Sequence, residues 1–121
     1  LFQNDLEGTI SRYNIIQNAR MYKAGIAVAK VDHTIGRVTA AQAADELLNI
    51  SGIEASFVLF PDGERVILSA RSMGDINVQV ILEKLGGGGN AATAGAQVAN
   101  PSVDAVFKQL LQAIDQYLSD E

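Results

Sequence analysis

The chain has 121 residues, of which 48% are hydrophobic and 19% are charged, an ordinary composition for one compact globular domain. It contains no cysteine and a single histidine, His33, which excludes a disulfide framework, a thiolate nucleophile and a cysteine-based zinc site, and argues against a His-rich metal centre. A net charge of −5 without a basic tract disfavours long nucleic acids as partners, although a few local donors could still hold a small anionic ligand.

Apolar residues recur at helical spacing through residues 2–22 and predict a first helix. Its narrow apolar stripe comprises Phe2, Leu6, Ile10, Tyr13 and Ile16. Such a stripe could pack against an upstream domain as easily as against this one. The chain begins with Leu1 rather than methionine, and we expect it to be part of a longer protein. We therefore expect residues 1–22 to connect an upstream domain to a second domain formed by residues 23–121.

The next elements follow from local signals. Residues 25–32 form a short apolar run rich in valine and alanine, which predicts a buried strand. Thr39 and Gln42 have the spacing of a capping box, which predicts the start of a helix that Gly52 ends. The β-rich runs 56–60 and 65–70 flank the sequence PDGE and predict a hairpin, because proline presets a turn and glycine supplies a positive φ.

The C-terminal part completes an α/β pattern. Asp75 predicts the N-cap of a helix that Gly86 ends, and the apolar piece around Gln97 and Val98 predicts an edge strand. The last helix is predicted from Pro101 to Tyr117, with proline in its first turn and one apolar stripe: Val103, Phe107, Leu110, Ile114 and Leu118. The sequence thus predicts a small mixed β-sheet with a central hairpin, packed against helices.

The stretch "EKLGGGGNAATAGAQ", residues 83–97, could be a flexible linker or an ordered loop. Its many alanines favour the ordered loop, because a solvated tether usually carries serine or charge. Consecutive glycine amides could then turn toward one point and form an anion nest, with a short helix starting near Asn90 adding its N-terminal dipole. A P-loop is rejected because its lysine is missing, and a dinucleotide fingerprint is rejected because the glycines follow a helix.

Arg71 stands in the sequence "SARS", where the second strand of the hairpin ends. It could pair with a surface carboxylate, or it could offer two parallel N–H donors to a phosphate, with Ser69 and Ser72 adding hydroxyl donors. The residues alone leave both interpretations open. We find no Asp and His cluster with metal-ligand spacing, so the sequence predicts no hydrolytic centre in this chain.

Together, the stretches "ISGIEASFVLF", "SARSMGDINVQVILEKLGGGGN" and "ATAGAQV" resemble the DHH-associated domain of DHH-family phosphoesterases, over about residues 20–118. The segment "INVQVILEKLGGGG" is most similar to the C-terminal part of GGDEF-domain-containing cyclic-di-AMP phosphodiesterases. The resemblance implies that residues 23–121 bind a cyclic dinucleotide or a short oligonucleotide. The implied binding residues are Arg71, Ser72, Asn77 at the pocket floor, the loop Gly87, Gly88 and Gly89, and Asn90.

The resemblance also implies that an upstream DHH domain holds manganese and performs the hydrolysis. This chain would then hold no metal or cofactor of its own and would be inactive alone. The implied location is cytoplasmic, in a parent that is anchored to the membrane. One departure from the family pattern is Asn90, which replaces the loop histidine: asparagine still forms hydrogen bonds, but it neither takes up a proton nor stacks as imidazole does.

Two alternatives stay open. One is a regulatory domain that senses an adenine dinucleotide without hydrolysing it, and Asn90 in place of histidine favours this alternative. The other is a dimerisation module in which the first and last amphipathic helices pair two chains.

Overall fold

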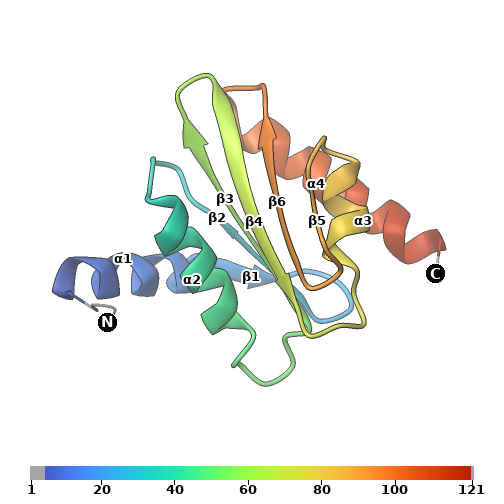
Figure 1. Cartoon of the computed structure of the whole chain (residues 1–121), viewed down its shortest axis with the longest axis horizontal. Helices are drawn as coiled ribbons and strands as arrows, with labels where there is room; N and C mark the ends of the chain where they lie inside the picture. Colours follow the sequence, from blue (N-terminus) through green and yellow to red (C-terminus); the bar gives the residue numbers. More distant parts are fainter. Residues whose placement is uncertain (1–4, 121) are drawn as a thin grey trace.

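A mixed β-sheet with helices on both faces confirms the predicted α/β class (Figure 1). The structure is a computed structural model that describes residues 5–120. Within that range the sheet has six strands in the order β1-β2-β3-β4-β6-β5; β2 and β3 are parallel, and the other neighbours are antiparallel. The elements are α1 (Leu6–Gln17), β1 (Ala19–Met21), β2 (Ile26–Lys30), α2 (Arg37–Leu47), β3 (Ala55–Asp62), β4 (Arg65–Ser72), α3 (Val78–Glu83), β5 (Gly88–Gly89), β6 (Thr93–Val98) and α4 (Val103–Asp120).

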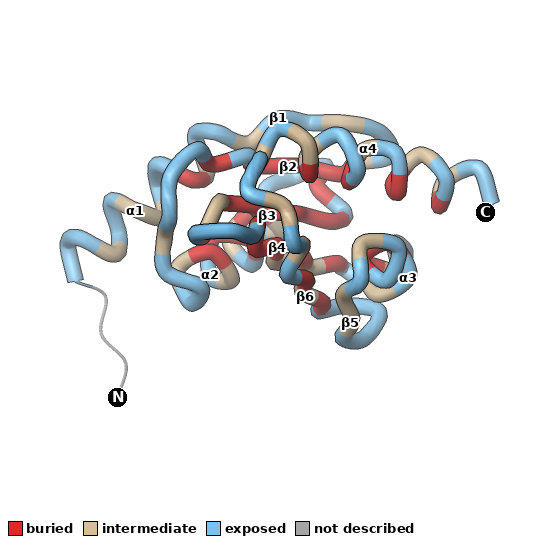
Figure 2. Tube along the Cα trace, turned by 90° about the horizontal axis from the view of Figure 1, so that it is seen from above, coloured by how far each residue is buried: buried red, intermediate tan, exposed pale blue. Residues whose placement is uncertain are grey.

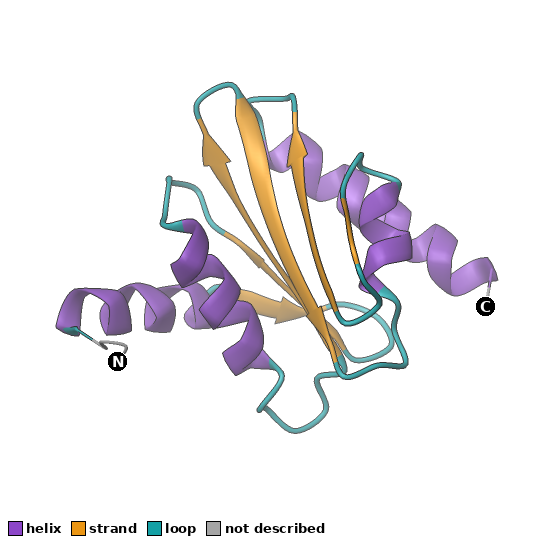
Figure 3. Cartoon of the chain, viewed as in Figure 1, coloured by secondary structure: helices purple, strands orange, loops and turns teal. Residues whose placement is uncertain are grey.

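The sheet carries an apolar core on each face, because successive side chains of a strand point to opposite sides. Phe57 and Leu68 belong to the core under α3 and α4, whereas Val58, Phe60 and Ile67 belong to the core under α1 and α2. These residues are buried, as the central strands in Figure 2 show. Figure 3 shows the two pairs of helices on either side of the sheet.

The first helix is shorter than predicted. It begins after Asp5, whose Oδ1 accepts a hydrogen bond from the Gly8 N–H at 2.7 Å, and it ends at Gln17. Residues Ala19–Met21 then pair antiparallel with β2. The prediction of one helix over residues 2–22 is therefore wrong at its C-terminal end, because local periodicity carries no signal for this strand pairing.

The predicted stripe of α1 faces mainly outward. Leu6, Ile10 and Tyr13 are 75%, 49% and 60% exposed, whereas Ile15 on the other side of the helix is buried against α2 and the sheet. Phe2 lies outside the described residues. The helix thus attaches to this domain by one side and presents apolar side chains on the other.

The predicted capping box of the second helix is wrong. Gly36 is the N-cap of α2, which begins at Arg37, so Thr39 lies inside the first turn. The helix ends at Leu47, ahead of Gly52, whose φ of 91° serves the turn into β3. The buried face of α2, formed by Ala40, Ala43, Ala44 and Leu47, packs on the sheet and sets the extent of the helix.

The hairpin is confirmed and is longer than predicted. Strands β3 and β4 pair from Ala55 with Ser72 to Asp62 with Arg65, so the loop consists of residues 63 and 64 alone. Gly63 has a φ of 64°, which fits a two-residue hairpin turn. Pro61 pairs within the ladder and does not set the turn, contrary to the prediction.

Both ends of α3 are defined by local contacts. The N-cap is Asn77 rather than Asp75, because Asn77 Oδ1 accepts from the Val80 N–H at 3.2 Å. Gly86 ends the helical segment as predicted: its φ is 83°, its N–H donates to Glu83 O, and the Gly87 N–H donates to Leu82 O. This is the pattern of a Schellman motif.

The last helix is confirmed, and its apolar stripe faces the core. Ser102 caps it by accepting from the Ala105 N–H at 3.1 Å, so Pro101 precedes the helix instead of lying in its first turn. The predicted stripe packs against or within the core under α3 and α4: Val103, Phe107, Leu110, Ile114 and Leu118. The stripe of α4 is therefore occupied inside the domain and is not available to pair two chains.

A surface network ties the turn between β1 and β2 to α4. Asp115 accepts hydrogen bonds from the Tyr22 hydroxyl at 2.8 Å and from Lys23 Nζ at 3.0 Å. The hydrogen bond from the Lys23 ammonium, followed by that from Tyr22, lowers the pKa of Asp115 below its ordinary value of 3.8. A carboxyl with a lowered pKa in the folded state contributes stability above its unfolded pKa and loses it as the pH falls through the folded value.

We therefore expect Asp115→Asn to reduce the free energy of unfolding at pH 7, and the deficit to shrink as the pH falls below 3.8. Urea unfolding of the two proteins at a series of pH values measures the difference. Asp120→Asn, with the same charge change on the same helix, is the control. A deficit that stays constant down to pH 2 would contradict the assigned ion pair.

Candidate functional site: a groove beside the glycine strand

The glycine-rich stretch is an ordered part of the sheet. Gly88 pairs with Gly95, and Gly89 pairs with Ala94, which makes β5 an edge strand. The prediction of an ordered segment rather than a slack linker is confirmed. The strand predicted around residues 97–98 is β6, which begins earlier than expected. Its predicted place at the edge is wrong, because β6 lies between β4 and β5.

A tight turn led by Asn90 joins β5 to β6. Asn90 Oδ1 accepts from the backbone N–H groups of Ala92 and Thr93 at 3.0 and 2.9 Å. No helix starts near Asn90, contrary to the prediction, since the chain passes from this turn directly into β6. The asparagine side chain thus holds the turn that leads out of the glycine strand.

Three backbone amides around the glycines already have hydrogen-bond partners within the chain. Gly86 N–H donates to Glu83 O, Gly87 N–H donates to Leu82 O, and Asn90 N–H donates to Thr93 O. These donors are satisfied by the helix end and the β-turn. The predicted anion nest is therefore not formed by these three amides.

The backbones of residues 87–89 and of β6 lie so close together that two of these glycine positions have no room for a side chain. A Cβ on Gly87 would lie 2.3 Å from Gly95 O, and a Cβ on Gly89 would lie 2.3 Å from Thr93 O. Gly89 also has a φ of 145°. A Cβ on Gly88 would meet nothing within 4 Å. Gly87 and Gly89 are therefore needed for the packing of β5, whereas Gly88 borders open space.

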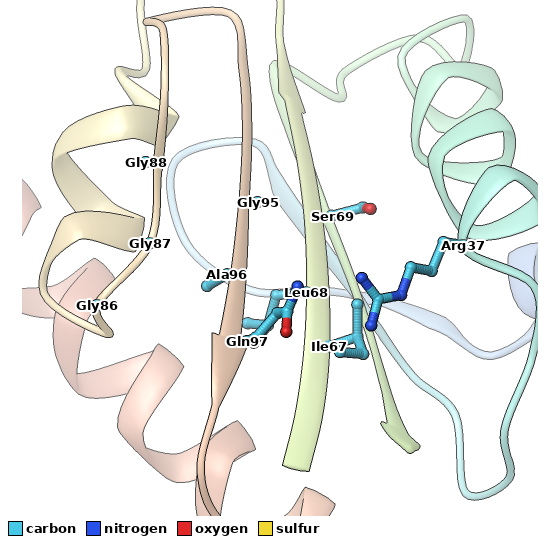
Figure 4. A pocket seen from close by; sticks show the side chains of 10 residues that line it. All are labelled: Arg37, Ile67, Leu68, Ser69, Gly86, Gly87, Gly88, Gly95, Ala96 and Gln97. Carbon is cyan, nitrogen blue, oxygen red and sulfur yellow. The ribbon is translucent and has the colours of Figure 1, made fainter.

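That open space is a groove of about 470 Å³ beside the glycine strand (Figure 4). Its floor is the part of β4 and β6 that α2 leaves uncovered, and Arg37 of α2 reaches over it from the opposite side. The lining residues are Arg37, Ile67, Leu68, Ser69, Gly86, Gly87, Gly88, Gly95, Ala96 and Gln97. None of these described lining residues is acidic.

Strand register places one row of residues on the groove side of the sheet. Ser69 lies opposite Gly95, and Gly95 lies opposite Gly88, so these three positions face the same way. Two residues further along β4, Arg71 lies opposite Thr93 and shares this face. The structure therefore brings Arg71 and the glycine strand to one side of the sheet.

The Arg71 guanidinium is held in place by α2 and its own strand. Its Nε lies 3.1 Å from Asp45 Oδ1, and its Nη1 donates to Ala70 O at 2.8 Å. The side chain is mostly buried, whereas the Asp45 carboxylate is mostly exposed. A guanidinium has five N–H donors, so these two contacts fix its plane and leave further donors, including both on Nη2.

Ser72 and Asn77 have structural contacts away from the groove. The Ser72 side chain is buried, and its Oγ accepts from the Gly74 N–H at 3.0 Å. Asn77 caps α3, and its own N–H donates to the Tyr117 hydroxyl at 3.0 Å. The helix α3 covers the face opposite the groove, so the structure does not bring Ser72 and Asn77 to the groove. Their role in binding a substrate stays a prediction.

Sequence reasoning did not single out Arg37 or Gln97 as binding residues. Gln97 Oε1 accepts a hydrogen bond from Arg65 Nη1 at 2.6 Å. The Nη2 atom of Arg37 lies 3.7 Å from Asp62 Oδ2, which is beyond hydrogen-bond distance. The alternation of β4 and β6 could have identified Gln97, but no local signal places Arg37 beside these strands.

The part of the chain that the structure describes contains no group of three or more His, Asp or Glu side chains that could hold a metal ion. His33 is exposed, and its Nδ1 lies 3.0 Å from Asp32 Oδ1. Across the same range of residues, no helix has the length and apolar character that crossing a membrane requires.

Comparison with known proteins shows which family and which relatives this chain resembles. The DHHA1 domain model matches residues 23–120. The chain is 41% identical over 122 residues to the cyclic-di-AMP phosphodiesterase PdeA of Listeria monocytogenes, covering 98% of this chain and 19% of PdeA. It is 42% identical over 120 residues to the cyclic-di-AMP phosphodiesterase GdpP of Geobacillus thermodenitrificans, covering 97% of this chain and 18% of GdpP. The chain thus spans about a fifth of the length of these relatives.

A solved structure confirms the fold. An exopolyphosphatase-related protein from Bacteroides fragilis superposes with a TM-score of 0.81 at 20% sequence identity, covering 95% of this chain and 36% of that protein. At this identity the likeness concerns the arrangement of the strands and helices alone.

Proposed function

This chain belongs to the DHHA1 domain family, and we propose that it is the substrate-binding domain of a metal-dependent phosphodiesterase that opens a cyclic dinucleotide, such as cyclic di-AMP, or cuts a short oligonucleotide. In this proposal residues 23–121 form the binding domain on the cytoplasmic side of the parent protein. Residues 1–22 connect it to an upstream DHH domain that supplies manganese and the hydrolytic centre.

The groove beside the glycine strand carries the proposal. Its polar side chains are the guanidinium of Arg37, the hydroxyl of Ser69 and the amide of Gln97, and its described lining contains no carboxylate. Such a lining suits a ligand that is rich in acceptor atoms and negative charge, as a phosphodiester is. Gly88 lets that ligand approach the backbone of β5 without meeting a side chain.

Arg71 is the residue that we assign to the scissile phosphate. Asp45 and the Ala70 carbonyl fix its guanidinium, so its remaining donors are oriented before a ligand arrives. During hydrolysis a water oxygen bonds to phosphorus as a ribose oxygen leaves as an alcohol, and negative charge grows on the phosphoryl oxygens. Fixed donors at that position stabilise the charge without reorganisation during the reaction.

The experiment is a turnover assay of the full-length protein with cyclic di-AMP, with and without manganese, followed by chromatography of the product. Manganese-dependent formation of the linear dinucleotide supports the proposal. Tight binding of cyclic di-AMP without any product would instead support the sensor alternative. Absence of both binding and product would contradict the proposal and the sensor alternative together.

A further inference from the structure

Arg37 stands at one end of the groove, and no ion pair within hydrogen-bond distance holds it in the part of the chain that the structure describes. Figure 4 shows its guanidinium extending from α2 over Ile67 and toward Ser69. Its side chain is 54% exposed, and the 3.7 Å separation from Asp62 Oδ2 is too long for a hydrogen bond. The guanidinium can therefore turn toward a ligand without breaking a hydrogen bond to Asp62.

Gln97 lies at the same end of the groove, opposite Ile67 in the sheet. The Arg65 guanidinium carries hydrogen-bond donors only, so the Gln97 atom that faces it at 2.6 Å is the acceptor Oε1. The Nε2 donors of Gln97 are left for another partner. Arg37 and Gln97 thus offer donors to the same region, which favours an acceptor with negative charge.

The Arg37 end and the Arg71 end of this face are well separated. Arg37 and Gln97 lie beside Ile67, whereas Arg71 lies four residues further along β4, a span of about 13 Å for an extended strand. Arg37 lines the groove, whereas Arg71 does not and is held against Asp45, so the two guanidinium groups serve different positions on this face. A ligand with two phosphates could occupy both ends at once.

We propose that Arg37 and Gln97 form a second phosphate subsite, which holds the phosphate that is not cleaved while Arg71 holds the one that is. This inference rests on the proposed function and narrows it, because it makes the preferred substrate a dinucleotide with two phosphates. A dinucleoside with a single phosphate fills the Arg71 end and leaves the Arg37 end empty.

The test compares ligands with two phosphates and with one, in the full-length protein. The KM for cyclic di-AMP is measured together with the inhibition constant of ApA, the linear dinucleoside with one phosphate. We expect Arg37→Gln to raise the KM for cyclic di-AMP about tenfold, as loss of one charge-assisted hydrogen bond would, and to leave the inhibition constant of ApA unchanged. Arg37→Lys keeps the charge and should recover part of the loss.

The matched control is Arg20→Gln, which removes the same charge at β1, on the opposite edge of the sheet. An unchanged KM for cyclic di-AMP in Arg37→Gln, or an equal weakening of ApA, would overturn the second subsite. Titration calorimetry with the metal chelated gives the same contrasts as dissociation constants. If the protein binds cyclic di-AMP but does not hydrolyse it, the proposed phosphodiesterase activity is overturned. The dissociation constants still show whether Arg37 belongs to a second phosphate subsite.

Discussion

Gly87→Ala should lower the free energy of unfolding of the chain by about 3 kcal/mol, whereas Gly88→Ala should change it by less than about 0.5 kcal/mol. The added methyl group at Gly87 would lie 2.3 Å from Gly95 O and 2.7 Å from Ala96 Cβ. Both contacts belong to β6 and one is with its backbone, so relief requires β5 to leave the sheet. The methyl group at Gly88 would meet nothing within 4 Å.

Urea unfolding followed by circular dichroism measures both variants in the 121-residue chain. Hydrogen exchange at Gly95 and Ala96 would show whether β5 separates before the rest of the sheet. Equal stability of the two variants would contradict the close approach of β5 to β6. The Gly89→Ala variant should resemble Gly87→Ala, since a Cβ there would lie 2.3 Å from Thr93 O and the φ is 145°.

Comparison of Gly87→Ala with Gly88→Ala also distinguishes an effect on folding from an effect on ligand binding. Gly88 faces the same side of the sheet as Ser69 and lines the groove. If the groove is the substrate site, Gly88→Ala should keep the fold and raise the dissociation constant for cyclic di-AMP, because the methyl group occupies the path of the ligand. Unchanged binding in Gly88→Ala would place the ligand elsewhere.

The elements that the sequence predicted well are those defined by contacts close in the chain. The hairpin follows from β-rich runs around Gly63, and α4 follows from one apolar stripe. The end of α3 at Gly86 follows from the positive φ that a Schellman motif requires. In each case the residues that decide the structure lie within a few positions of one another.

The elements that the sequence did not predict depend on pairing with strands elsewhere in the chain. β1 forms because Ala19–Met21 pairs with β2, and β5 forms because two glycines lie against β6. Neither segment has the alternating apolar pattern of a half-buried strand. Propensity and capping signals cannot reveal such pairing, since it depends on tertiary contacts.

Part of the site could have been assigned more closely from the sequence. In "RVILSARS" the alternation of a strand puts Ser69 and Arg71 on one face and Ser72 on the other, and the structure agrees. Asp45 and Arg37 could not have been assigned to this face in advance. They reach it only because α2 packs across β3 and β4, and its packing is a tertiary event.

Arg71→Ala should lower kcat/KM for cyclic di-AMP about a hundredfold in the full-length protein, through both a higher KM and a lower kcat. The proposed guanidinium contact exists in the bound substrate and strengthens as charge develops on the phosphoryl oxygens. Steady-state kinetics measures both constants. The fold should persist, because the Asp45 carboxylate is mostly exposed and is hydrated once its partner is removed.

Arg71→Lys tests whether charge alone is sufficient. An ammonium keeps the positive charge but cannot contact a carboxylate and a phosphate through one rigid plane. We therefore expect kcat/KM for this variant to lie between the wild-type value and that of Arg71→Ala. A lysine variant as active as wild type would show that the planar geometry is not needed.

Asp45→Asn distinguishes a binding role of Arg71 from a structural one. If Arg71 acted only by pairing with Asp45 across α2 and β4, then removing either partner would have the same effect on activity. If instead Arg71 contacts the substrate, Asp45→Asn leaves the guanidinium in place, tethered through Nη1 to Ala70 O. Its kcat/KM should then fall far less than that of Arg71→Ala. Equal losses in the two variants, with equal losses of stability, would remove Arg71 from the proposed binding site.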